Sequence, residues 1–369
     1  MTKPLISIVA ATRPNFMKVA PLLKKLEAHQ SRVSTHLIHT GQHYDNLMND
    51  TFFSQLDIQA PFKNFEIGSG SHAFQTSKTM MAFEKYLLEY SPQLVIVVGD
   101  VNATLACAIA ASKCKIKVAH VESGLRSFDR KMPEEINRLL TDTISDYLYT
   151  PTIQAGEQLL SEGVSKEKIV FVGNIMIDTL YAFKDRAMQL NYATQLGINC
   201  DYSVLTLHRP STVDNKKMFN LVLTALSEIS NKMTIVFPAH PRTKDRIISF
   251  GLESFFNFGS VEPNKINIID PLGYLEMLSL VVSSSAVLTD SGGLQEETTS
   301  LGIPCLTLRE NTERPITVEQ GSNMIVGRDP KRILDGFEKI MMQDLDYSKP
   351  DRWDGNTAER IIEHILTII

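Results

Sequence analysis

Short apolar runs alternate with amphipathic helical segments along the whole of this 369-residue chain. Alternation of this kind is typical of βαβ units, in which parallel strands lie between layers of helices. Several of the runs are almost continuously apolar, as expected of strands that are covered on both faces. In the first half we predict strands at residues 5–11, 35–41, 94–100, 117–123 and 169–174. In the second half we predict strands at residues 204–208, 234–240, 266–270, 286–292 and 304–309.

The pattern restarts after a more polar stretch at residues 184–201. A chain of this length corresponds to about two domains. We therefore predict an α/β fold with two Rossmann-like, doubly wound parallel-sheet domains, formed by residues 1–174 and 175–355. An amphipathic helix at residues 356–369 lies outside the second series of strands, and we expect it to pack back on the first domain. Ligands of such sheets bind beyond the carboxyl ends of the strands, so we expect one cleft between the domains.

Composition excludes several classes of protein. The chain has 37 Lys and Arg residues against 42 Asp and Glu residues, a net charge of -5, and no basic cluster, so we expect no nucleic-acid partner. No apolar run approaches the roughly 20 residues that cross a bilayer, and the apolar residues 5–11 lack the features of an export signal. The cysteines, Cys107, Cys114, Cys200 and Cys305, form no C-x-x-C pair. We therefore expect reduced cysteines, no membrane association and a cytoplasmic location.

The segment TDSGGLQEE places Ser291, Gly292 and Gly293 at a turn between a strand and a helix. Free N–H groups at the start of a helix bind phosphate, and glycines let the backbone approach an anion closely. Glu297, one turn into that helix, would accept a hydrogen bond from a ribose hydroxyl. The alternative interpretation is an ordinary turn with a serine cap, followed by a solvated acid.

The segment ATRPNFMK places Arg13 directly after the first strand and Lys18 in the helix that follows. Two cations at this position would neutralise a diphosphate, although a pair of surface charges is the alternative. The segment is not G-x-G-x-x-G, so the fingerprint of a dinucleotide cofactor is missing. The nine histidines of the chain show no metal-ligand spacing, and we expect no metal.

Three carboxylates lie at positions suited to general acid and base catalysis. Asp100 ends the most apolar strand, Glu122 ends another strand, and Glu134 opens a helix in MPEEINR. Carboxylates in different environments are what acid and base steps require, although a cap or a structural hydrogen bond is the alternative for each one. His208 follows the first strand of the second half, where a histidine is either a catalyst or a structural hydrogen-bonder.

Nine motifs occur along almost the whole chain: ATRPNFMKVAPL, TGQHYDNLM, VVGDVNATLA, HVESGLRSFDRKMPEEINR, VGNIMIDTL, LTLHRP, DPLGYLEM, LTDSGGLQEE and RENTERP. In content and order they resemble the non-hydrolysing UDP-N-acetylglucosamine 2-epimerases. The resemblance implies the arrangement called GT-B, in which two Rossmann-like domains face one another across a cleft and the last helix crosses back to the first. It also implies a homodimer.

The reaction implied by the resemblance is reversible epimerisation at C2 between UDP-N-acetylglucosamine and UDP-N-acetylmannosamine, which supplies precursors of cell-surface polysaccharides. The C2 hydrogen of an N-acetyl sugar is not acidic, because no carbonyl lies beside C2. In the family UDP therefore leaves first, and a carboxylate removes the C2 proton. UDP then adds again to the bound 2-acetamidoglucal as a proton arrives from the opposite face. This chemistry needs no cofactor.

The family's functional residues carry over to matching positions of this sequence. The acid and base candidates are Asp100, Glu122 and Glu134, and His208 is a catalytic or positioning group at the diphosphate. The UDP-sugar would be bound by Arg13, Lys18, Ser291, Gly292, Gly293, Glu297 and Arg314, with Leu272 and Met277 lining the uracil pocket. Further contacts near the sugar would come from Gln42, His43 and Arg138.

The sequence departs from the family pattern after His208, where Pro210, Ser211 and Thr212 replace part of the usual H-R-x-E-N. Some bacterial members bind a second UDP-N-acetylglucosamine as an activator beside this segment. We therefore expect that regulation to be absent and the kinetics to be hyperbolic. Three alternatives stay open: a 2-epimerase of UDP-2,3-diacetamido-2,3-dideoxy-glucuronic acid, a hydrolysing epimerase, and a GT-B glycosyltransferase.

Overall fold

The computed structural model describes residues 3–41, 53, 55–342 and 347–369, and it describes Arg13 by its backbone alone. The chain forms two compact units. Unit 1 comprises Met1–Thr179 and Asp351–Ile369, and unit 2 comprises Leu180–Pro350. The chain thus leaves unit 1 after residue 179, beyond the boundary at residues 174 and 175 that the sequence pattern indicates, and returns at residue 351.

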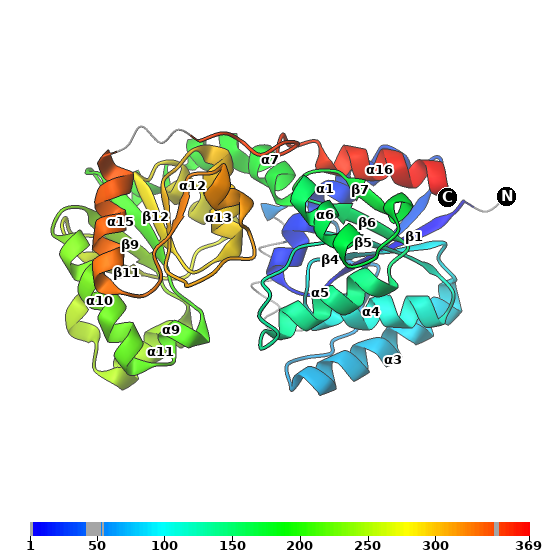
Figure 1. The fold of residues 1–369 in the computed structure, drawn as a ribbon, viewed down its shortest axis with the longest axis horizontal. Coiled ribbons are helices and arrows are strands. Elements are labelled where there is room, and N and C mark those ends of the chain that lie inside the picture. The colour runs from blue at the N-terminus through cyan, green and yellow to red at the C-terminus, as the bar shows by residue number, and fades with distance from the viewer. Residues whose placement is uncertain (1–2, 42–52, 54, 343–346) are drawn as a thin grey trace. The chain divides into compact units, whose positions relative to one another are not determined.

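Unit 1 is built on a seven-stranded parallel sheet with the order β3-β2-β1-β4-β5-β6-β7 (Figure 1). Its strands are β1 (Leu5–Ala10), β2 (Ser34–His39), β3 (Lys63–Asn64), β4 (Leu94–Val98), β5 (Lys117–Val121), β6 (Tyr147–Thr150) and β7 (Ile169–Phe171). Its helices are α1 (Arg13–Glu27), α3 (His72–Tyr90), α4 (Asn102–Lys113), α5 (Pro133–Ile144), α6 (Ile153–Ser161), the 3-10 helix Lys166–Lys168, and α16 (Thr357–Ile368). Helix α7 (Ile175–Leu190) begins in unit 1 and ends in unit 2.

Unit 2 repeats this plan with the strand order β10-β11-β9-β8-β12-β13-β14, again parallel throughout. Its strands are β8 (Tyr202–Thr206), β9 (Thr234–Pro238), β10 (Phe256–Phe258), β11 (Ile266–Ile269), β12 (Ala286–Thr289), β13 (Cys305–Thr307) and β14 (Asn323–Ile325). Its helices are α8 (Tyr192–Gln195), α9 (Pro210–Val213), α10 (Lys216–Ser230), α11 (Pro241–Phe250), the 3-10 helix Glu253–Phe255, α12 (Tyr274–Val282), α13 (Gly292–Leu301), α14 (Ile316–Glu319) and α15 (Pro330–Met342).

The strands of unit 2 are buried on both faces. Leu205 and Leu288 belong to the apolar cluster that includes residues of α10 and α15. Val204 and Val287, one position earlier on the same strands, belong to a second cluster with residues of α8 and α12. Because successive side chains of a strand point to opposite faces, a continuously apolar strand fills both layers of core.

Helix α16 packs against α1 within unit 1 (Figure 1). The buried carboxylate of Asp178 accepts hydrogen bonds from the first backbone amides of α16, from Thr357 N at 3.1 Å and Ala358 N at 2.7 Å. Ahead of the helix, the buried Trp353 donates from Nε1 to the carbonyl of Pro151 at 3.1 Å. The apolar face of α16, including Ile361, is fully buried.

The prediction of an α/β fold with two doubly wound parallel sheets is confirmed, and each predicted strand corresponds to a strand of the structure. Four short strands, β3, β6, β10 and β14, were not predicted. Several predicted strands extend too far, because the polar residues at their carboxyl ends belong to the loops that follow.

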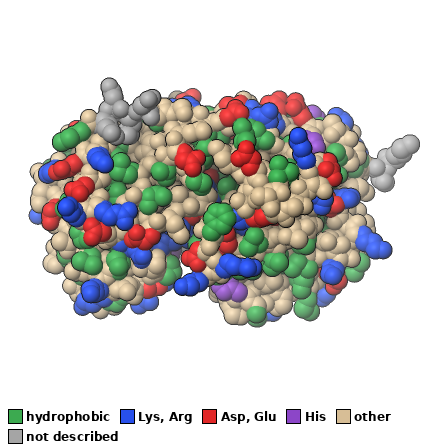
Figure 2. All heavy atoms as spheres, in the orientation of Figure 1, with side chains coloured by type: hydrophobic (Ala, Val, Ile, Leu, Met, Phe, Trp, Pro, Cys, Tyr) green, Lys and Arg blue, Asp and Glu red, His purple; other side chains and the backbone are tan. Residues whose placement is uncertain are grey.

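Charged side chains of both signs are interspersed over the face of the molecule drawn in Figure 2. This mixture agrees with a net charge of only -5 for the whole chain. Within the described ranges, no helix combines the length and apolar character that a membrane span requires.

Candidate active site

Each sheet collects polar residues at its topological switch point, where the connections from adjacent strands leave in opposite directions. In unit 1 this point lies between β1 and β4, and in unit 2 between β8 and β12. A crevice at the carboxyl ends of such strands is the usual ligand site of a doubly wound sheet. Lys18 and Asp100 follow β1 and β4, whereas His208 and Asp290 follow β8 and β12.

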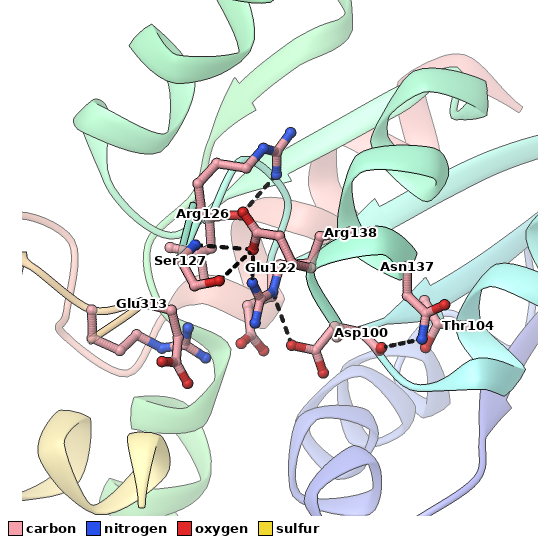
Figure 3. A network of polar contacts seen from close by, with 12 residues as sticks. Asp100, Thr104, Glu122, Arg126, Ser127, Asn137, Arg138 and Glu313 are labelled. Atoms are coloured by element: carbon pink, nitrogen blue, oxygen red, sulfur yellow. Dashed lines mark hydrogen bonds and ion pairs between the residues drawn. The ribbon is translucent and has the colours of Figure 1, made fainter. Parts of the chain in front are cut away.

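Asp100 is held at the end of β4 by residues of α5 (Figure 3). Arg138 donates from Nε to Asp100 Oδ2 at 3.0 Å, and Asn137 donates from Nδ2 to the Asp100 carbonyl at 2.9 Å. The Arg138 side chain is buried, whereas the Asp100 side chain is 26% exposed. The carboxylate therefore has a fixed direction and remains accessible.

Glu122 directly follows β5 and lies in the left-handed region, with a φ of 73°. This conformation costs a non-glycine residue about 1–2 kcal/mol, so it persists only where the surroundings hold it. The Glu122 backbone N–H donates to the Tyr149 carbonyl at 3.1 Å, and its carboxylate forms a buried ion pair with Lys18 of α1. A Cβ on Gly99 would lie 2.9 Å from Lys18 Nζ, so glycine at position 99 leaves room for the lysine.

The neighbouring glutamates at the start of α5 differ in their surroundings. Glu135 is buried and accepts hydrogen bonds from Ser127 N, Ser127 Oγ and Phe128 N, each at 2.9 Å, and it pairs with Arg138. Glu134 is half-buried, and no described residue forms a hydrogen bond or ion pair with its side chain. Glu135 thus fixes the loop after β5, while Glu134 is available to a ligand.

His120, on β5, joins α5 to the loop after β4. Its Nδ1 lies 2.7 Å from Asp142 Oδ1, and its Nε2 lies 2.8 Å from the carbonyl of Gly99. Arg126 Nη1 lies 2.7 Å from Asp142 Oδ2. Burial alone would raise the pKa of the Asp142 carboxyl, but His120 and Arg126 outweigh burial and lower the pKa. His120 is therefore a structural hydrogen-bonder that fixes the residue preceding Asp100.

In unit 2, the His208 ring contacts the buried carboxylate of Asp290. His208 Nδ1 lies 2.8 Å from Asp290 Oδ1. The backbone amides of His208 and Arg209 donate to Asp290 Oδ2 at 2.9 and 2.8 Å. Burial would raise the pKa of Asp290, but the His208 ring and these amides lower it overall, so Asp290 is ionised.

Ser291, Gly292 and Gly293 form the start of α13 as predicted, directly after Asp290. The Ser291 side chain does not cap the helix, so it does not occupy the first amides at the positive end of the helix dipole. One turn further, Glu297 accepts a hydrogen bond from the Tyr274 hydroxyl at 3.3 Å. Burial raises the pKa of Glu297 to about 7, so Glu297 is not the solvated acid of the alternative interpretation.

Three arginines surround Glu313 near α13. Arg309 Nη2 and Arg209 Nη2 lie 2.9 and 3.5 Å from its carboxylate. Burial would raise the pKa of Glu313, but Arg314 and Arg309 lower it to about 2. Arg314 also donates from Nε to Glu296 at 2.6 Å. The cluster concentrates positive charge beside the helix start and is suited to an anion.

The remaining predicted site residues have different outcomes. Leu272 and Met277 are half-buried at the edge of the core beside α12. Gln42 and His43 lie outside the described residues, as does the side chain of Arg13. Within the part of the chain that the structure describes, no group of three or more His, Cys, Asp or Glu residues is placed to hold a metal ion.

Two residues of the site were missed in the sequence, Asp290 and Glu135. Each lies directly beside a predicted residue, at Ser291 and Glu134. Their position next to a predicted site residue was the only indication of a role in the sequence. Sequence position alone does not distinguish which of two neighbours points into the protein and which points outward.

A family profile described as UDP-N-acetylglucosamine 2-epimerase matches residues 24–366. The chain belongs to the UDP-N-acetylglucosamine 2-epimerase family. Among its relatives in this family, the UDP-N-acetylglucosamine 2-epimerase of Methanocaldococcus jannaschii is 44% identical over 369 residues, covering 98% of each chain. The UDP-2,3-diacetamido-2,3-dideoxy-D-glucuronate 2-epimerase of Pseudomonas aeruginosa is 38% identical and covers 99% of each chain.

Solved structures of UDP-N-acetylglucosamine 2-epimerases have the same fold. The M. jannaschii enzyme in complex with UDP-GlcNAc and UDP matches with a TM-score of 0.89 at 42% identity, covering 99% of this chain and 100% of that one. The Neisseria meningitidis enzyme bound to UDP-GlcNAc matches with a TM-score of 0.87 at 29% identity, covering 98% and 100%. The family membership that the sequence motifs indicate is thus confirmed.

Proposed function

We propose that this chain interconverts UDP-N-acetylglucosamine and UDP-N-acetylmannosamine by elimination and re-addition of UDP. The observation that carries the proposal is the set of three carboxylates at the carboxyl edge of the unit 1 sheet. They differ in their surroundings: Arg138 holds Asp100, Lys18 pairs with Glu122, and Glu134 has no partner among the described residues. Groups in different environments are suited to the acid and base roles of one reaction.

In the proposed reaction the C1–O bond breaks first, and its electron pair leaves with the β-phosphate of UDP. Positive charge at C1 acidifies the C2 hydrogen, and one carboxylate takes that proton to give 2-acetamidoglucal. A carboxylic acid then returns a proton to C2 from the opposite face, and UDP adds to C1. We assign these proton transfers to Asp100, Glu122 and Glu134 as a set.

The departing UDP requires stabilisation of the negative charge on its β-phosphate. We assign this role to His208, Arg13, Lys18, Arg314 and the helix start at Ser291, Gly292 and Gly293. Glu297 would accept from the ribose hydroxyls, and Leu272 and Met277 would contact uracil. Arg138, Gln42 and His43 would act near the sugar.

The test is incubation with UDP-N-acetylglucosamine in D2O, followed by NMR. We expect UDP-N-acetylmannosamine to form and deuterium to appear at C2 of the sugar. Free N-acetylmannosamine would identify a hydrolysing enzyme, and unchanged substrate without exchange would contradict the proposal.

Replacement of one carboxylate tests its chemical role. We expect Asp100→Asn to retain UDP binding but to lose C2 exchange by a factor on the order of 10² or more, since an amide cannot carry the proton. Asp201→Asn, at an exposed position, is the matched control and should leave exchange unchanged. Retained exchange in Asp100→Asn would remove Asp100 from the acid and base set.

The diacetamido-glucuronate sugar is the second candidate substrate, since the P. aeruginosa relative that is 38% identical acts on it. That sugar carries a carboxylate and a second acetamido group, so it would need additional polar contacts in the pocket. Comparison of kcat/KM for the two UDP-sugars decides between them, and a larger value for the diacetamido substrate would replace our proposal.

We further propose a homodimer that contacts through α3. Phe74, Met81 and Leu88 recur at intervals of seven along this helix and are 39%, 62% and 72% exposed, so they form an apolar stripe on one helix face. Light scattering should give the mass of a dimer, and Met81→Lys with Leu88→Lys should give a monomer.

We also propose a cytoplasmic location and a role in supplying precursors of cell-surface polysaccharide. Cys107, Cys114, Cys200 and Cys305 are all free, as is usual for proteins in a reducing compartment. Deletion of the gene should deplete UDP-N-acetylmannosamine in cell extracts, and an unchanged pool would contradict this role.

A further inference from the structure

Asp290 is a fully buried carboxylate, and one of its oxygens lies within hydrogen-bond distance of both neighbouring backbone amides. The residue is 0% exposed, while the side chain of its neighbour His208 is 51% exposed. Oδ2 accepts the backbone amides of His208 and Arg209 at 2.9 and 2.8 Å, whereas Oδ1 lies 2.8 Å from His208 Nδ1 and accepts only a longer bond of 3.2 Å from the His208 amide. The shorter backbone hydrogen bonds therefore go to Oδ2, and the shortest contact of Oδ1 is with the histidine ring.

A purely structural role does not require a carboxylate here. The oxygen of an asparagine would satisfy both amides without the several kcal/mol that burying a charge costs. A carboxylate adds two properties that an amide lacks. It accepts hydrogen bonds without donating any, and it carries a negative charge beside the ring.

We propose that Asp290 is a positioning residue that holds His208 with Nδ1–H directed inward and Nε2 directed toward the diphosphate of the UDP-sugar. Because Asp290 only accepts, Nδ1 must carry the hydrogen. The negative charge also stabilises the doubly protonated ring, whose Nε2–H then donates to the β-phosphate as charge develops on it. No proton is transferred in this step, and the role rests on the proposed function of His208.

The geometry predicts what asparagine would do at this position. In Asp290→Asn the two backbone amides would claim the amide oxygen, so the NH2 group would face His208 Nδ1. Nδ1 would then have to accept, and the hydrogen of the neutral ring would move to Nε2. A doubly protonated ring would place Nδ1–H against this NH2 group and would be disfavoured.

Nitrogen-15 NMR of histidine-labelled protein tests this arrangement without reference to activity. The His208 ring signals are assigned by their loss in His208→Gln. At a pH where the ring is neutral, we expect the hydrogen on Nδ1 in the unmodified protein and on Nε2 in Asp290→Asn. A hydrogen on Nε2 in the unmodified protein would overturn the proposal, and this measurement stands even if the variant fails to fold.

Steady-state kinetics provide the second test. We expect Asp290→Asn to lower kcat on the order of 10²-fold or more, with KM changed by less than about threefold, because the interaction strengthens as the bond breaks. The double variant with His208→Gln should lose no more than His208→Gln alone. Additive losses would mean that Asp290 does not act through His208.

Asp178→Asn is the matched control, since Asp178 is also buried and accepts two backbone amides but has no histidine partner among the described residues. We expect its kcat to stay unchanged. If the unmodified protein does not act on UDP-N-acetylglucosamine, the proposed function fails while the tautomer still tests Asp290. If His208→Gln is fully active but the Nδ1–H tautomer is present, only the role of His208 fails.

Discussion

Glu297 is a buried carboxyl group whose ionisation opposes folding of the ligand-free protein. Burial raises its pKa from 4.5 to about 7. The native state therefore keeps a proton that the unfolded chain has already released, and stability falls as the pH rises between these two values. One pKa unit corresponds to about 1.4 kcal/mol, so the full cost above pH 7 is about 3 kcal/mol.

Replacement of Glu297 by glutamine should remove this penalty. We expect Glu297→Gln to be more stable than the unmodified protein by about 1–3 kcal/mol at about pH 8, and close to it at about pH 5, where the wild-type carboxyl is protonated. Thermal unfolding at the two pH values measures the difference. Glu253→Gln, an exposed glutamate, is the control, and equal stabilisation at both pH values would contradict the prediction.

The residues to which we assign ligand contacts were easier to predict than the residues that hold them. Asp100, Glu122 and His208 lie at strand ends, and chain position alone indicates that such residues reach the crevice. Asp290 and Glu135 were missed because their roles depend on which way a side chain turns. A residue that caps two amides and a residue beside it that faces solvent look alike in sequence.

At the scale of elements, a substitution at the start of α13 should have opposite effects on the stability of the free protein and on UDP binding. Apart from its chain neighbours and the nearby backbone of α13, no described atom lies within 4 Å of the position that a Cβ on Gly293 would take. Alanine in a helix is favoured over glycine by about 0.5–1 kcal/mol, so Gly293→Ala should raise the thermal midpoint of the free protein. It should also weaken UDP binding about tenfold or more, because the methyl group would meet the diphosphate.

Gly156→Ala in α6 is the matched control for this pair of measurements. A Cβ there would make an ordinary contact, 3.5 Å from Ile169 Cγ2, so helix stability should rise without any change in UDP affinity. Calorimetric titration with UDP decides the outcome. Unchanged UDP affinity in Gly293→Ala would mean that the diphosphate does not approach this helix start.

Helix α16 is needed to complete the core of unit 1. Ile361 is fully buried, and its replacement by alanine should cost about 2–5 kcal/mol because a cavity remains. Urea unfolding measures this loss. Ile369→Ala removes the same atoms at an exposed position, so it should change the stability of unit 1 by less than about 0.5 kcal/mol.

The long central strands were predictable, whereas three edge strands, β3, β10 and β14, and the short inner strand β6 were not. Continuous apolar runs such as β4 are specified by burial on both faces, and this pattern is visible in the sequence. The edge strands β3 and β14 are two and three residues long, too short to show any periodicity. Their pairing depends on neighbours that are distant in the chain.

For the molecule as a whole, we expect hyperbolic dependence of the initial rate on UDP-N-acetylglucosamine. The altered residues after His208 form the short helix α9, and Arg328 Nη1 donates to the Ser211 carbonyl at 2.9 Å. The segment is thus held by a hydrogen bond from another part of unit 2. Reactions started from UDP-N-acetylmannosamine should show no lag, and a lag removed by added UDP-N-acetylglucosamine would contradict the prediction.

The boundary between the units was difficult to place because a helix runs through it. α7 continues from Ile175 to Leu190, whereas the chain changes unit after Thr179. Composition therefore shows no break at the crossing point. The polar stretch at residues 184–201 contains the end of α7 and the short α8.

The return of the chain to unit 1 has a consequence for synthesis on the ribosome. α1 ends at Glu27, and its packing partner α16 begins at Thr357, a separation of 357 − 27 = 330 residues. At about 5–20 residues per second, this interval takes roughly 15–70 s. All of unit 2 is translated before the last helix, so the half that is begun first is completed last. During that interval the face of α1 that α16 will cover is open to chaperones and to other nascent chains.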